Sequence, residues 1–529
     1  MINIRNFSYS YPENRSALKE VDLSISSGEF VLLAGPNGGG KSTLLQAILG
    51  VVPEYYGGEL SGTITFEGKN IGEFGVVKLA GKVGIVLQDP ESQISNLTVW
   101  EEVTFALGNL LLPKDEVIAR GIEALATMGI ASLKDYTVET LSGGQLQRLA
   151  IATLLAIRPK VLILDEPLAN LDPLGVNSVV EAVKILKEHV DVVIVASHWL
   201  DPFLDISTRL IVIDSGRIAL DIPSNSIGSY LDELRSLSVE IPQKILVRKM
   251  LSEQGIAFQS SDEPLRLPFG ATLRMLSPLT AFQGRIGLQL RDVGYSYDGN
   301  LNRLEDVTFS LGSSSRVAVV GHNGAGKSTL ARLLAGLRKP TKGYLTSKFS
   351  SVSMTTQKPG LGFITSNVLD ELRYGTSLSV ADAEKILVAY DLAKFAGVSP
   401  FTLSGGEQRR FSLAIALATN PDLIIMDEPT AGMDTRQVEF VQKIMEGFNG
   451  ASVYITHDPR LVGTFLKEVI VLDRGRLAYH GPTAEMTKDI FELLGYGYTN
   501  ATIAFALRYL STGLPMVPSQ IEVQNEPGI

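Results

Sequence analysis

The stretch GPNGGGKS (Gly35–Ser42) directly follows the apolar run Val31–Ala34 and precedes a helical pattern. It matches G-x-x-x-x-G-K-[ST], in which a glycine-rich loop joins a buried strand to a helix. Glycines let the backbone wrap around phosphate groups, and the amide groups at the helix N-terminus face the negative charge. The lysine reaches the outer phosphates, and the hydroxyl ligates Mg²⁺. The sequence therefore predicts a phosphate-binding loop after a β-strand.

The same motif occurs again as GHNGAGKS (Gly321–Ser328), after the apolar run Val317–Val320. Lys41 and Lys327 are 286 residues apart, and three later motifs recur in the same order at separations of 259 to 262 residues. Repeats of solenoid proteins are far shorter, at roughly 20 to 50 residues. The chain is therefore predicted to contain two copies of one domain, with a shortened middle region in the second copy.

Each copy alternates short apolar runs with longer helical patterns, which predicts an α/β fold: two P-loop NTPase-type domains, each a mainly parallel sheet with flanking helices. The clearest strands besides the two above are expected at Val161–Leu164, Val192–Ala196, Leu423–Met426 and Ser452–Thr456. Residues 241–285 lose this periodicity and contain four prolines, which is typical of a linker. The predicted boundaries are 1–240 for the first domain, 241–285 for the linker, 286–510 for the second domain and 511–529 for a tail of no assigned role.

The amino-acid composition limits which kinds of partner and which cellular compartment are expected for this chain. The 529 residues are 45% hydrophobic and 20% charged with a formal net charge of −10, so no basic stripe favours nucleic acid as a partner. The absence of cysteine excludes disulfides and thiolate metal sites and is compatible with the cytosol. The N-terminus lacks a secretory pattern, so no leader is expected. Apolar runs are far below the roughly 20 residues of a membrane-spanning helix, so the chain is expected not to cross a membrane by itself.

Both copies carry a strand that ends in two carboxylates, Asp165-Glu166 and Asp427-Glu428. At the open end of a strand, the aspartate is suited to bind Mg²⁺ directly or through water, and the glutamate to polarise an attacking water. Such a sequence by itself is also typical of a turn before a helix. The phosphate-binding loop upstream favours the catalytic interpretation.

The stretches LSGGQ (Leu141–Gln145) and LSGGE (Leu403–Glu407) resemble the signature motif of ATP-binding-cassette proteins. Physically, the serine hydroxyl, the glycine amides and the following helix N-terminus form a second anion-binding group. The serine is also compatible with a simple helix N-cap. Both copies place the motif 23 residues before the strand-end aspartate, and the resemblance covers roughly residues 2–241 and 286–510, including a helical signature subdomain.

The resemblance implies roles for further residues. Gln88 and Gln357 are similar to the glutamines that touch Mg²⁺ and water, and His198 and His457 to the switch histidines that contact the γ-phosphate. A histidine there is also compatible with a strand-end structural role. Asp172 and Asp434 are similar to aspartates that link two sites. Tyr11 and Tyr297 resemble the aromatic residue that stacks on adenine, although both are equally compatible with packing at a strand edge.

The candidate residues form three groups. Expected catalytic residues are Glu166, Glu428, His198 and His457. Expected Mg²⁺ ligands are Ser42, Gln88, Asp165, Ser328, Gln357 and Asp427. Expected ATP-binding residues are Gly35, Pro36, Asn37, Gly38, Gly39, Gly40, Lys41, Ser42, Thr43, Gly321, His322, Asn323, Gly324, Ala325, Gly326, Lys327, Ser328, Thr329, Ser142, Gly143, Gly144, Ser404, Gly405, Gly406, Tyr11 and Tyr297.

In the family that these motifs resemble, cassettes pair head to tail, so that each ATP is bound by the phosphate loop of one copy and the signature of the other. The resemblance implies intramolecular pairing of Lys41 with Ser404, and of Lys327 with Ser142. ATP binding would then favour closure of the pair, and hydrolysis would release it.

Among tandem cassettes, the chain most resembles fused energy-coupling-factor ATPases, which serve vitamin and metal importers. The similarity lies in FSYSYP (Phe7–Pro12), in QDPESQ (Gln88–Gln93), and in the LTV and EEV runs that follow. It implies transmembrane partners on other chains, namely a coupling protein and a substrate-capturing protein, and a peripheral position on the cytoplasmic face of the membrane. An ordinary acidic surface loop has the same composition. The second copy reads QKPGLG there, so its partner contacts are expected to differ.

Several residues depart from the family pattern or stand outside it. Trp199 follows His198 where an acidic residue is usual, and Gly39 replaces a frequent serine. Neither change removes a phosphate ligand, and the sequence leaves open whether the two sites turn over at equal rates. His189 and His480 match no motif, and we expect both to be solvated.

Two other functions remain open from the sequence. One is a tandem-cassette ATPase that acts on ribosomes or nucleic acid, which the acidic charge disfavours. The other is the tandem ATPase of a sugar importer, which is usually degraded at one site. Co-purified transmembrane chains would favour import, whereas ribosomes or nucleic acid would favour the first alternative.

Overall fold

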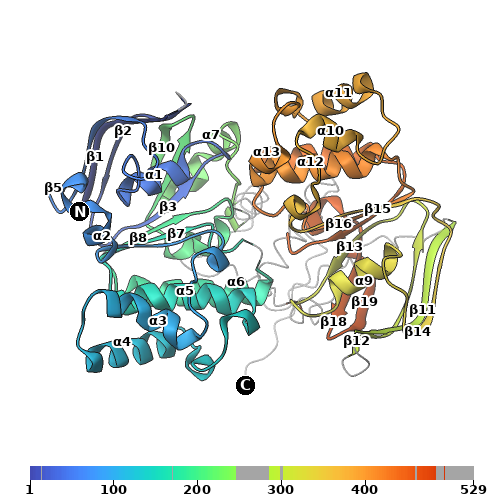
Figure 1. Ribbon diagram of the computed structural model, residues 1–529, viewed down its shortest axis with the longest axis horizontal. Coiled ribbons are helices and arrows are strands. Elements are labelled where there is room, and N and C mark those ends of the chain that lie inside the picture. Colours follow the sequence, from blue (N-terminus) through green and yellow to red (C-terminus); the bar gives the residue numbers. More distant parts are fainter. Residues whose placement is uncertain are drawn as a thin grey trace, which may run out of the picture. The chain divides into compact units, whose positions relative to one another are not determined.

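The computed structural model describes residues 1–12, 15–169, 171–242, 244–245, 285–297, 302–458 and 461–483, together with Met486 and Leu494. These residues divide into two compact units (Figure 1). The first contains the described residues up to 245 together with Met433–Arg436, and the second contains the remaining ones. The predicted linker, the end of the second cassette and the tail lie almost entirely outside the described residues.

The first cassette contains a six-stranded sheet in the order β10-β9-β3-β8-β7-β6. Strands β6, β7, β8, β3 and β9 are parallel, and only β10 runs antiparallel to its neighbour. This confirms the predicted parallel sheet and its three expected strands. The bounds are β3 Phe30–Ala34, β6 Val83–Val86, β7 Val161–Asp165, β8 Val192–Ala196, β9 Arg209–Asp214 and β10 Arg217–Pro223.

A second, antiparallel sheet in the first cassette has the order β2-β1-β4-β5. Its strands are β1 Ile2–Tyr11, β2 Arg15–Ile25, β4 Glu59–Phe66 and β5 Lys69–Asn70. This sheet was not predicted. It pairs β1 with β4 across β2, β3, the phosphate loop and α1 (Lys41–Ile48), and its register shifts at several points along β1.

The helices of the first cassette flank the sheets, as expected (Figure 1). They are α1 Lys41–Ile48, α2 Ile71–Ala80, α3 Val99–Asn109, α4 Lys114–Thr127, α5 Gly143–Ile157, α6 Pro173–Lys187 and α7 Leu231–Ser236. Helices α3, α4 and α5 pack on one another and form the helical subdomain that carries the LSGGQ motif.

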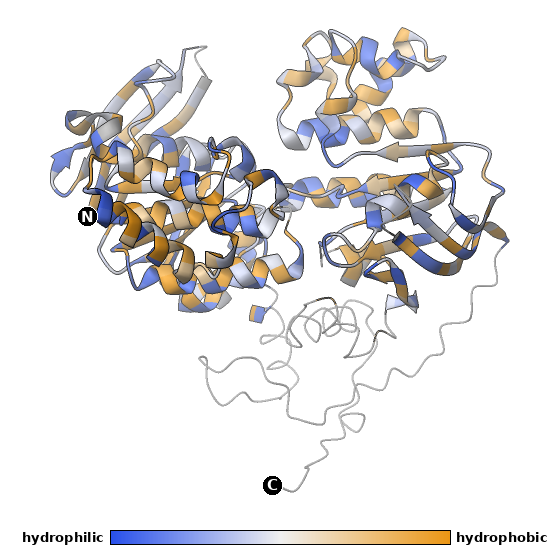
Figure 2. Cartoon of the chain, turned by 60° about the horizontal axis from the view of Figure 1, so that its bottom comes forward, coloured by the Kyte–Doolittle hydropathy of each residue, from blue (hydrophilic) through white to orange (hydrophobic). Residues whose placement is uncertain are grey.

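Strand β3 shows how the core positions the phosphate loop. Its five residues are all buried, and alternate side chains belong to two apolar clusters. Phe30 and Leu32 face the cluster that contains α5, whereas Val31 and Leu33 face the cluster that contains α1. A parallel strand covered on both faces reads as a continuous apolar run. Hydrophobic residues alternate with hydrophilic ones along many helices and strands of both units (Figure 2).

The second cassette repeats this architecture with a six-stranded sheet, β15-β16-β17-β13-β18-β19, and a three-stranded antiparallel sheet, β12-β11-β14. The strands are β11 Ile286–Ser296, β12 Asn302–Gly312, β13 Arg316–Val320, β14 Lys342–Ser347, β15 Val352–Thr355, β16 Leu423–Asp427, β17 Ala451–Ile455, β18 Glu468–Asp473 and β19 Arg476–Pro482. The helices are α9 Lys327–Leu334, α10 Val368–Arg373, α11 Val380–Ala389, α12 Gly405–Ala418 and α13 Thr435–Glu446.

The shortened middle region of the second cassette is confirmed. Residues 348–351, all described, connect β14 to β15 without a counterpart of α2. Helices α10 and α11 have 6 and 10 residues, whereas the corresponding α3 and α4 have 11 and 14.

Candidate nucleotide sites

The phosphate loop of the first cassette lies between β3 and α1, as predicted. Gly35 and Gly40 have φ angles of 139° and 112°, which side-chain-bearing residues rarely adopt. A Cβ atom on Gly35 would lie 2.0 Å from the carbonyl oxygen of Ile213 in β9. Glycine therefore lets the loop lie directly against the neighbouring strand.

Lys41 begins α1 and is buried at 7% exposure. Its Nζ atom donates hydrogen bonds to the carbonyl oxygens of Gly35 at 2.8 Å and Pro36 at 3.2 Å. Burial lowers the pKa of the ammonium group, and the nearby carboxylates Glu166 and Asp165 oppose this. The N-terminus of α1 has no side-chain cap and no acidic residue in its first turn. The lysine ammonium group and the uncapped N-terminus of α1 together form a site that suits an anion.

Ser42 and Asp165 meet at the end of β7. The serine Oγ donates to Oδ2 of Asp165 at 3.3 Å. Burial raises the pKa of Asp165, and the Lys41 charge opposes this. A hydroxyl and a carboxylate are hard oxygen ligands that suit Mg²⁺, which usually takes only one or two carboxylates and completes its shell with water and substrate phosphates.

Glu166 and His198 lie beside this pair. Glu166 has a left-handed φ of 46°, and its backbone nitrogen donates to the carbonyl oxygen of Ala196 at 2.8 Å. The backbone nitrogen of His198 donates to Oε2 of Glu166 at 3.2 Å. Nε2 of His198 lies 2.9 Å from Oδ1 of Asn37 and 3.5 Å from Nζ of Lys41. The fold thus brings residues from three motifs, the phosphate loop, the strand-end carboxylates and the switch histidine, to one sheet edge.

The second cassette repeats this geometry. Nζ of Lys327 donates to the carbonyl oxygens of Gly321 at 2.6 Å and His322 at 3.0 Å. Ser328 Oγ lies 3.5 Å from Oδ2 of Asp427, whose pKa is raised by burial. Glycine is again required at the loop entry, since a Cβ on Gly321 would lie 2.2 Å from a carbonyl oxygen in β18.

Glu428 occupies the position of Glu166, with a φ of 49° and a backbone hydrogen bond of 2.9 Å to the carbonyl oxygen of Ile455. The backbone nitrogen of His457 donates to Oε2 of Glu428 at 3.4 Å. Burial, followed by the charge of Asp427, raises the pKa of Glu428. A higher pKa makes the ionised carboxylate a stronger base, which suits it to accept a proton from water.

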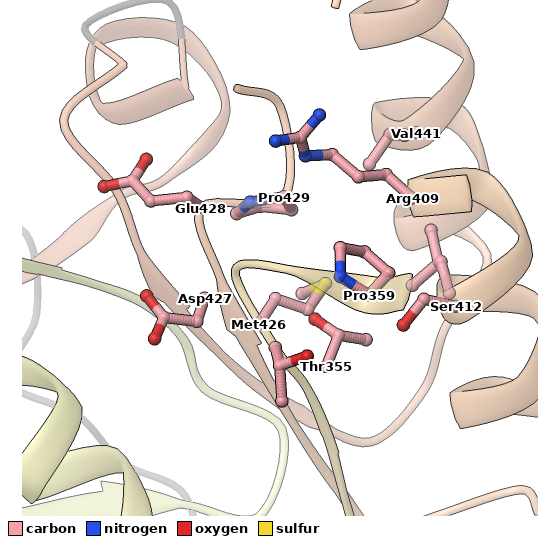
Figure 3. Close-up of a pocket in the computed structure, with 11 residues that line it drawn as sticks. Thr355, Pro359, Arg409, Ser412, Met426, Asp427, Glu428, Pro429 and Val441 are labelled. Atoms are coloured by element: carbon pink, nitrogen blue, oxygen red, sulfur yellow. The ribbon is translucent and has the colours of Figure 1, made fainter. Parts of the chain in front are cut away.

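A pocket beside these carboxylates is lined by β15, the loop after it, α12 and the end of β16 (Figure 3). Arg409 extends from α12 toward Pro429 and Glu428, and the Glu428 charge opposes the lowering of the Arg409 pKa by burial. Sequence reasoning missed this cation. Aligning the two halves could have drawn attention to Arg409, because the corresponding residue of the first cassette is the neutral Gln147.

Gln88 and Gln357 follow β6 and β15 by two residues and are exposed. Because β6 is parallel to β7, and β15 to β16, both glutamines emerge at the edge that holds the aspartates. Asp172 accepts a hydrogen bond from the Gly175 nitrogen at 2.8 Å and caps α6, whereas Asp434 is buried just before α13.

The signature serines cap helices, and this was the alternative interpretation of the motif. Ser142 Oγ accepts from the Gln145 nitrogen at 3.4 Å, and Gln145 Oε1 accepts from the Ser142 nitrogen at 2.9 Å. Ser404 and Glu407 form the same reciprocal box at the start of α12. Ser142, Gly143, Ser404 and Gly405 are exposed, so capping leaves these helix starts accessible. A capped helix start and an anion-binding group are compatible here.

The two tyrosines lie against the first helix after each phosphate loop. The Tyr11 hydroxyl lies 3.2 Å from both Thr43 Oγ1 and Gln46 Oε1. The Tyr297 hydroxyl accepts a hydrogen bond of 2.9 Å from Arg332. Both tyrosines are also paired edge-on with a neighbouring tyrosine ring, so the packing role is present and the adenine role stays a prediction.

One of the two histidine predictions outside the motifs is wrong. His189 is exposed, as expected. His480 lies instead on β19, with Nε2 2.7 Å from Oε1 of Glu468 on β18 and its ring 5.6 Å from the ring of Phe309 on β12. Glu468, on the neighbouring strand, is the hydrogen-bond partner of this histidine, which belongs to no sequence motif.

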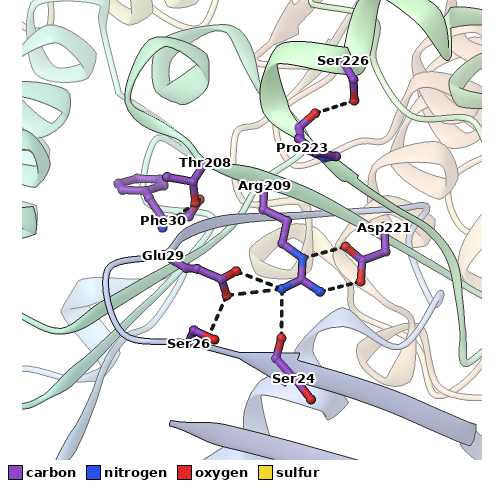
Figure 4. Close-up of polar contacts among 9 residues, drawn as sticks. All are labelled: Ser24, Ser26, Glu29, Phe30, Thr208, Arg209, Asp221, Pro223 and Ser226. Carbon is purple, nitrogen blue, oxygen red and sulfur yellow. Dashed lines mark hydrogen bonds and ion pairs between the residues drawn. The ribbon is translucent and has the colours of Figure 1, made fainter.

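The matching positions in the first cassette carry a stronger ion-pair network that sequence reasoning did not find (Figure 4). Arg209 donates to both carboxylate oxygens of Asp221 at 2.6 Å, to Glu29 at 3.1 and 3.2 Å, and to the carbonyl oxygen of Ser24 at 2.9 Å. The network joins β9 and β10 to the β2–β3 connection. It supports the strand from which Ile213 contacts the phosphate loop.

Comparisons with known proteins agree with this geometry. The family described as "ABC transporter" matches residues 18–169 and 304–431, more than half of the chain. A Methanosarcina acetivorans protein provisionally described as an ABC transporter ATP-binding protein is 33% identical, covering 97% of this chain and 91% of that protein. A Bacillus subtilis (strain 168) protein provisionally named as an HMP/thiamine import ATP-binding protein is also 33% identical, with 92% of each chain covered.

The archaeal ribosome recycling factor, solved with a ribosomal stalk protein, has the same fold with a TM-score of 0.60 at 20% identity, covering 91% of this chain and 90% of that chain. Two family matches in one chain explain the repeated phosphate loop and signature, which both lie within the matched residues. This chain belongs to the ABC transporter family, as an ATP-binding protein that carries two cassettes and hydrolyses ATP.

Proposed function

We propose that this chain is the ATP-hydrolysing subunit of a membrane importer of the energy-coupling-factor type, with its transmembrane parts on other chains. The observation that carries this is the presence of the same hydrolytic set, Glu166 with His198 and Glu428 with His457, in both cassettes. The relative provisionally named for HMP/thiamine import supports a vitamin-type cargo. Among the described residues, no helix has both the length and the apolarity needed to span a bilayer.

At each site, we assign the phosphates to the glycine-rich loop with Lys41 or Lys327. Mg²⁺ would be held by Ser42 and Asp165, or by Ser328 and Asp427, with Gln88 and Gln357 nearby, and would supply charge neutralisation at the transferred phosphate. The glutamate carboxylate orients a water and accepts its proton, and the histidine beside it contacts the γ-phosphate.

Each ATP is further proposed to be shared between the cassettes. Lys41 would act with the Ser404 signature, and Lys327 with the Ser142 signature. In this arrangement ATP favours the closed state because it contacts both cassettes only there, and hydrolysis removes this differential contact. The resulting motion would be transmitted to the transmembrane chains at the cytoplasmic face of the membrane.

Two segments after the glutamines are the proposed docking surfaces. In the first cassette, Asp89 and Glu91 are exposed, and Gln93 ties the loop to β6 through hydrogen bonds of 2.9 and 3.0 Å. The prediction that the acidic residues of this segment face a partner is only partly right. Glu102 is 6% exposed and accepts hydrogen bonds from the backbone nitrogens of residues 95 and 96. This glutamate fixes the loop and does not face a partner.

The second docking surface has a different chemistry. Lys358 replaces the acidic residue, and Leu361 and Ile364 are 85% and 67% exposed. Glu371 holds this loop as Glu102 holds the first, by accepting from the Ile364 nitrogen at 2.9 Å. A buried glutamate holds both loops in the same way, but the exposed residues of the two loops differ. We therefore infer two different partner segments, a basic one at the first cassette and a more apolar one at the second.

Capture of the full chain from detergent-solubilised native membranes tests this function. We expect small transmembrane chains to co-purify, and Glu91→Lys to reduce their recovery because it reverses the surface charge. Glu54→Lys, which changes another exposed glutamate outside the docking segment, is the control and should leave recovery unchanged. Recovery of ribosomes or nucleic acid in place of membrane chains would contradict the importer assignment.

A further inference from the structure

Thr430 and Asp458 form a hydrogen bond beside the hydrolytic residues of the second cassette. Oγ1 of Thr430 donates to Oδ2 of Asp458 at 2.8 Å. Thr430 is only 1% exposed, so its hydroxyl is removed from water. A buried hydroxyl without a partner is costly, and a carboxylate is a strong acceptor. Each residue therefore explains the presence of the other.

The bond lies one step beyond the reactive pair. Strands β16 and β17 are parallel neighbours with Asp427 opposite Ile455, and their chains continue into Glu428 and His457. Thr430 follows Glu428 by two residues, and Asp458 directly follows His457. The backbone nitrogen of Asp458 also donates to Thr456 Oγ1 at 3.0 Å, which fixes the turn after β17. The Thr430–Asp458 bond thus joins the two loops that carry the glutamate and the histidine.

The first cassette has an apolar pair at the same positions. Leu168 precedes Thr430 by 262 residues, the separation of Asp165 and Asp427, and Trp199 precedes Asp458 by 259, the separation of the two histidines. Leu168 is 7% exposed in the main apolar cluster, and Trp199 packs against that cluster. Both members of the pair differ together between the copies. Either change alone would bury a hydroxyl without its carboxylate, or place a carboxylate next to an apolar cluster.

We propose that Thr430 and Asp458 are positioning residues that hold His457 and Glu428 for hydrolysis, and that Leu168 and Trp199 hold His198 and Glu166 by apolar packing. The inference rests on the hydrolytic roles proposed above. A hydrogen bond is directional, whereas apolar contact is not. Turnover at the second site therefore depends on one hydroxyl group, and turnover at the first site does not.

The test measures ATP hydrolysis by the full chain in a Glu166→Gln background, in which the remaining turnover comes from the second site. Thr430→Val keeps the shape of the side chain and removes the hydroxyl, and we expect kcat to fall about tenfold with little change in KM for ATP, because small misplacements of catalytic groups cost rate. Thr430→Ser keeps the hydroxyl and should retain kcat. Unchanged kcat in Thr430→Val, or equal losses in both variants, would overturn the inference.

A pair exchange gives an independent readout. Thr430→Leu should lower second-site kcat, and adding Asp458→Trp should restore it, because the apolar pair of the first cassette is then complete. In a Glu428→Gln background, Leu168→Thr should lower first-site kcat, and adding Trp199→Asp should restore it. Failure of both restorations, with thermal unfolding temperatures that show folded protein, would contradict the pairing.

The same experiments separate this inference from the proposed function. If Glu428→Gln by itself leaves the ATPase rate of the otherwise unchanged chain unaffected, the hydrolytic assignment fails. If Glu428→Gln lowers the rate while Thr430→Val does not, the hydrolytic assignment stands and only the positioning role is wrong.

Discussion

The backbone nitrogen of His198 donates a hydrogen bond to Oε2 of Glu166 at 3.2 Å, and His457 does the same to Glu428 at 3.4 Å. The two residues of each pair come from neighbouring parallel strands and are 32 and 29 residues apart in sequence. The amide contact orients the glutamate at the strand end, beside the phosphate loop. This repeated contact is the structural basis of the hydrolytic assignment.

Replacement of these glutamates should separate hydrolysis from binding. Glu166→Gln and Glu428→Gln keep the shape and the amide contact but cannot accept a proton from water. Loss of general-base catalysis costs about 10²- to 10⁴-fold at the affected site. We expect each single variant to retain turnover only from the other site and the double variant to lose nearly all turnover. ATP binding, measured by fluorescence of a nucleotide analogue, should persist in all three.

The phosphate loop should tolerate alanine at one glycine and not at another. Gly35→Ala places a Cβ 2.0 Å from the Ile213 carbonyl oxygen, so the loop must move and ATP binding should be lost. Gly38 also has a positive φ, but a Cβ there meets no atom within 4 Å. Gly38→Ala should therefore cost only about 1 kcal/mol of stability. Equal effects of the two variants on ATP affinity would contradict the steric explanation.

Arg209 should contribute to stability more than other surface arginines. Arg209→Met leaves Glu29 and Asp221 without their shared cation, and the Arg209 side chain is only 22% exposed. Because the site is not fully buried, we expect a loss of about 2 kcal/mol, measured as a lower unfolding temperature of the first cassette. Arg235→Met removes an exposed ion pair with Asp232 and should change stability by less than about 0.5 kcal/mol. An equal decrease in unfolding temperature in the two variants would contradict the larger contribution of Arg209.

Arg332 should strengthen nucleotide binding at the second site. It contacts the Tyr297 hydroxyl, and its charge acts on Asp427, whereas the corresponding Gln46 is neutral. In a Lys41→Ala background, Arg332→Gln should weaken ATP binding a few-fold, about 0.5 to 1 kcal/mol, and reduce its dependence on salt. Arg332→Lys keeps the charge and should keep the salt dependence. The same salt dependence in Arg332→Gln and the parent would show that this cation does not act on the nucleotide.

The central sheet and the phosphate loops could be predicted because their signals are local. A run such as Val161–Leu164 is apolar throughout, since both faces of a parallel strand are covered, and the glycine-lysine spacing fixes the loop that follows. The antiparallel sheet could not be predicted in this way. Strand β1 pairs with β4 across the whole phosphate loop, and the register shifts of β1 are set by tertiary contacts. No local pattern records such pairing.

The side-chain partners beyond the motifs were missed for the same reason. Arg209 and Asp221 lie opposite each other only after β9 and β10 pair, and the Thr430 hydroxyl finds Asp458 only after two strands align. His480 matches no motif, so the sequence predicts a solvated residue, and its contact with Glu468 forms only after β18 and β19 pair. Comparison of the two halves at fixed separations is the sequence signal that could have found these pairs.

The shared nucleotide site is tested most directly by placing a charge in one signature at a time. In the Glu166→Gln chain, the remaining turnover requires Lys327 and, in the proposed arrangement, the Gly143 signature. Gly143→Asp and Gly405→Asp are a matched pair, because a Cβ at either position comes no closer than 3.8 and 3.6 Å to its nearest neighbour. We expect Gly143→Asp to abolish the remaining ATP hydrolysis and Gly405→Asp to spare it. The opposite result, loss with Gly405→Asp and retention with Gly143→Asp, would contradict a site shared between the two cassettes.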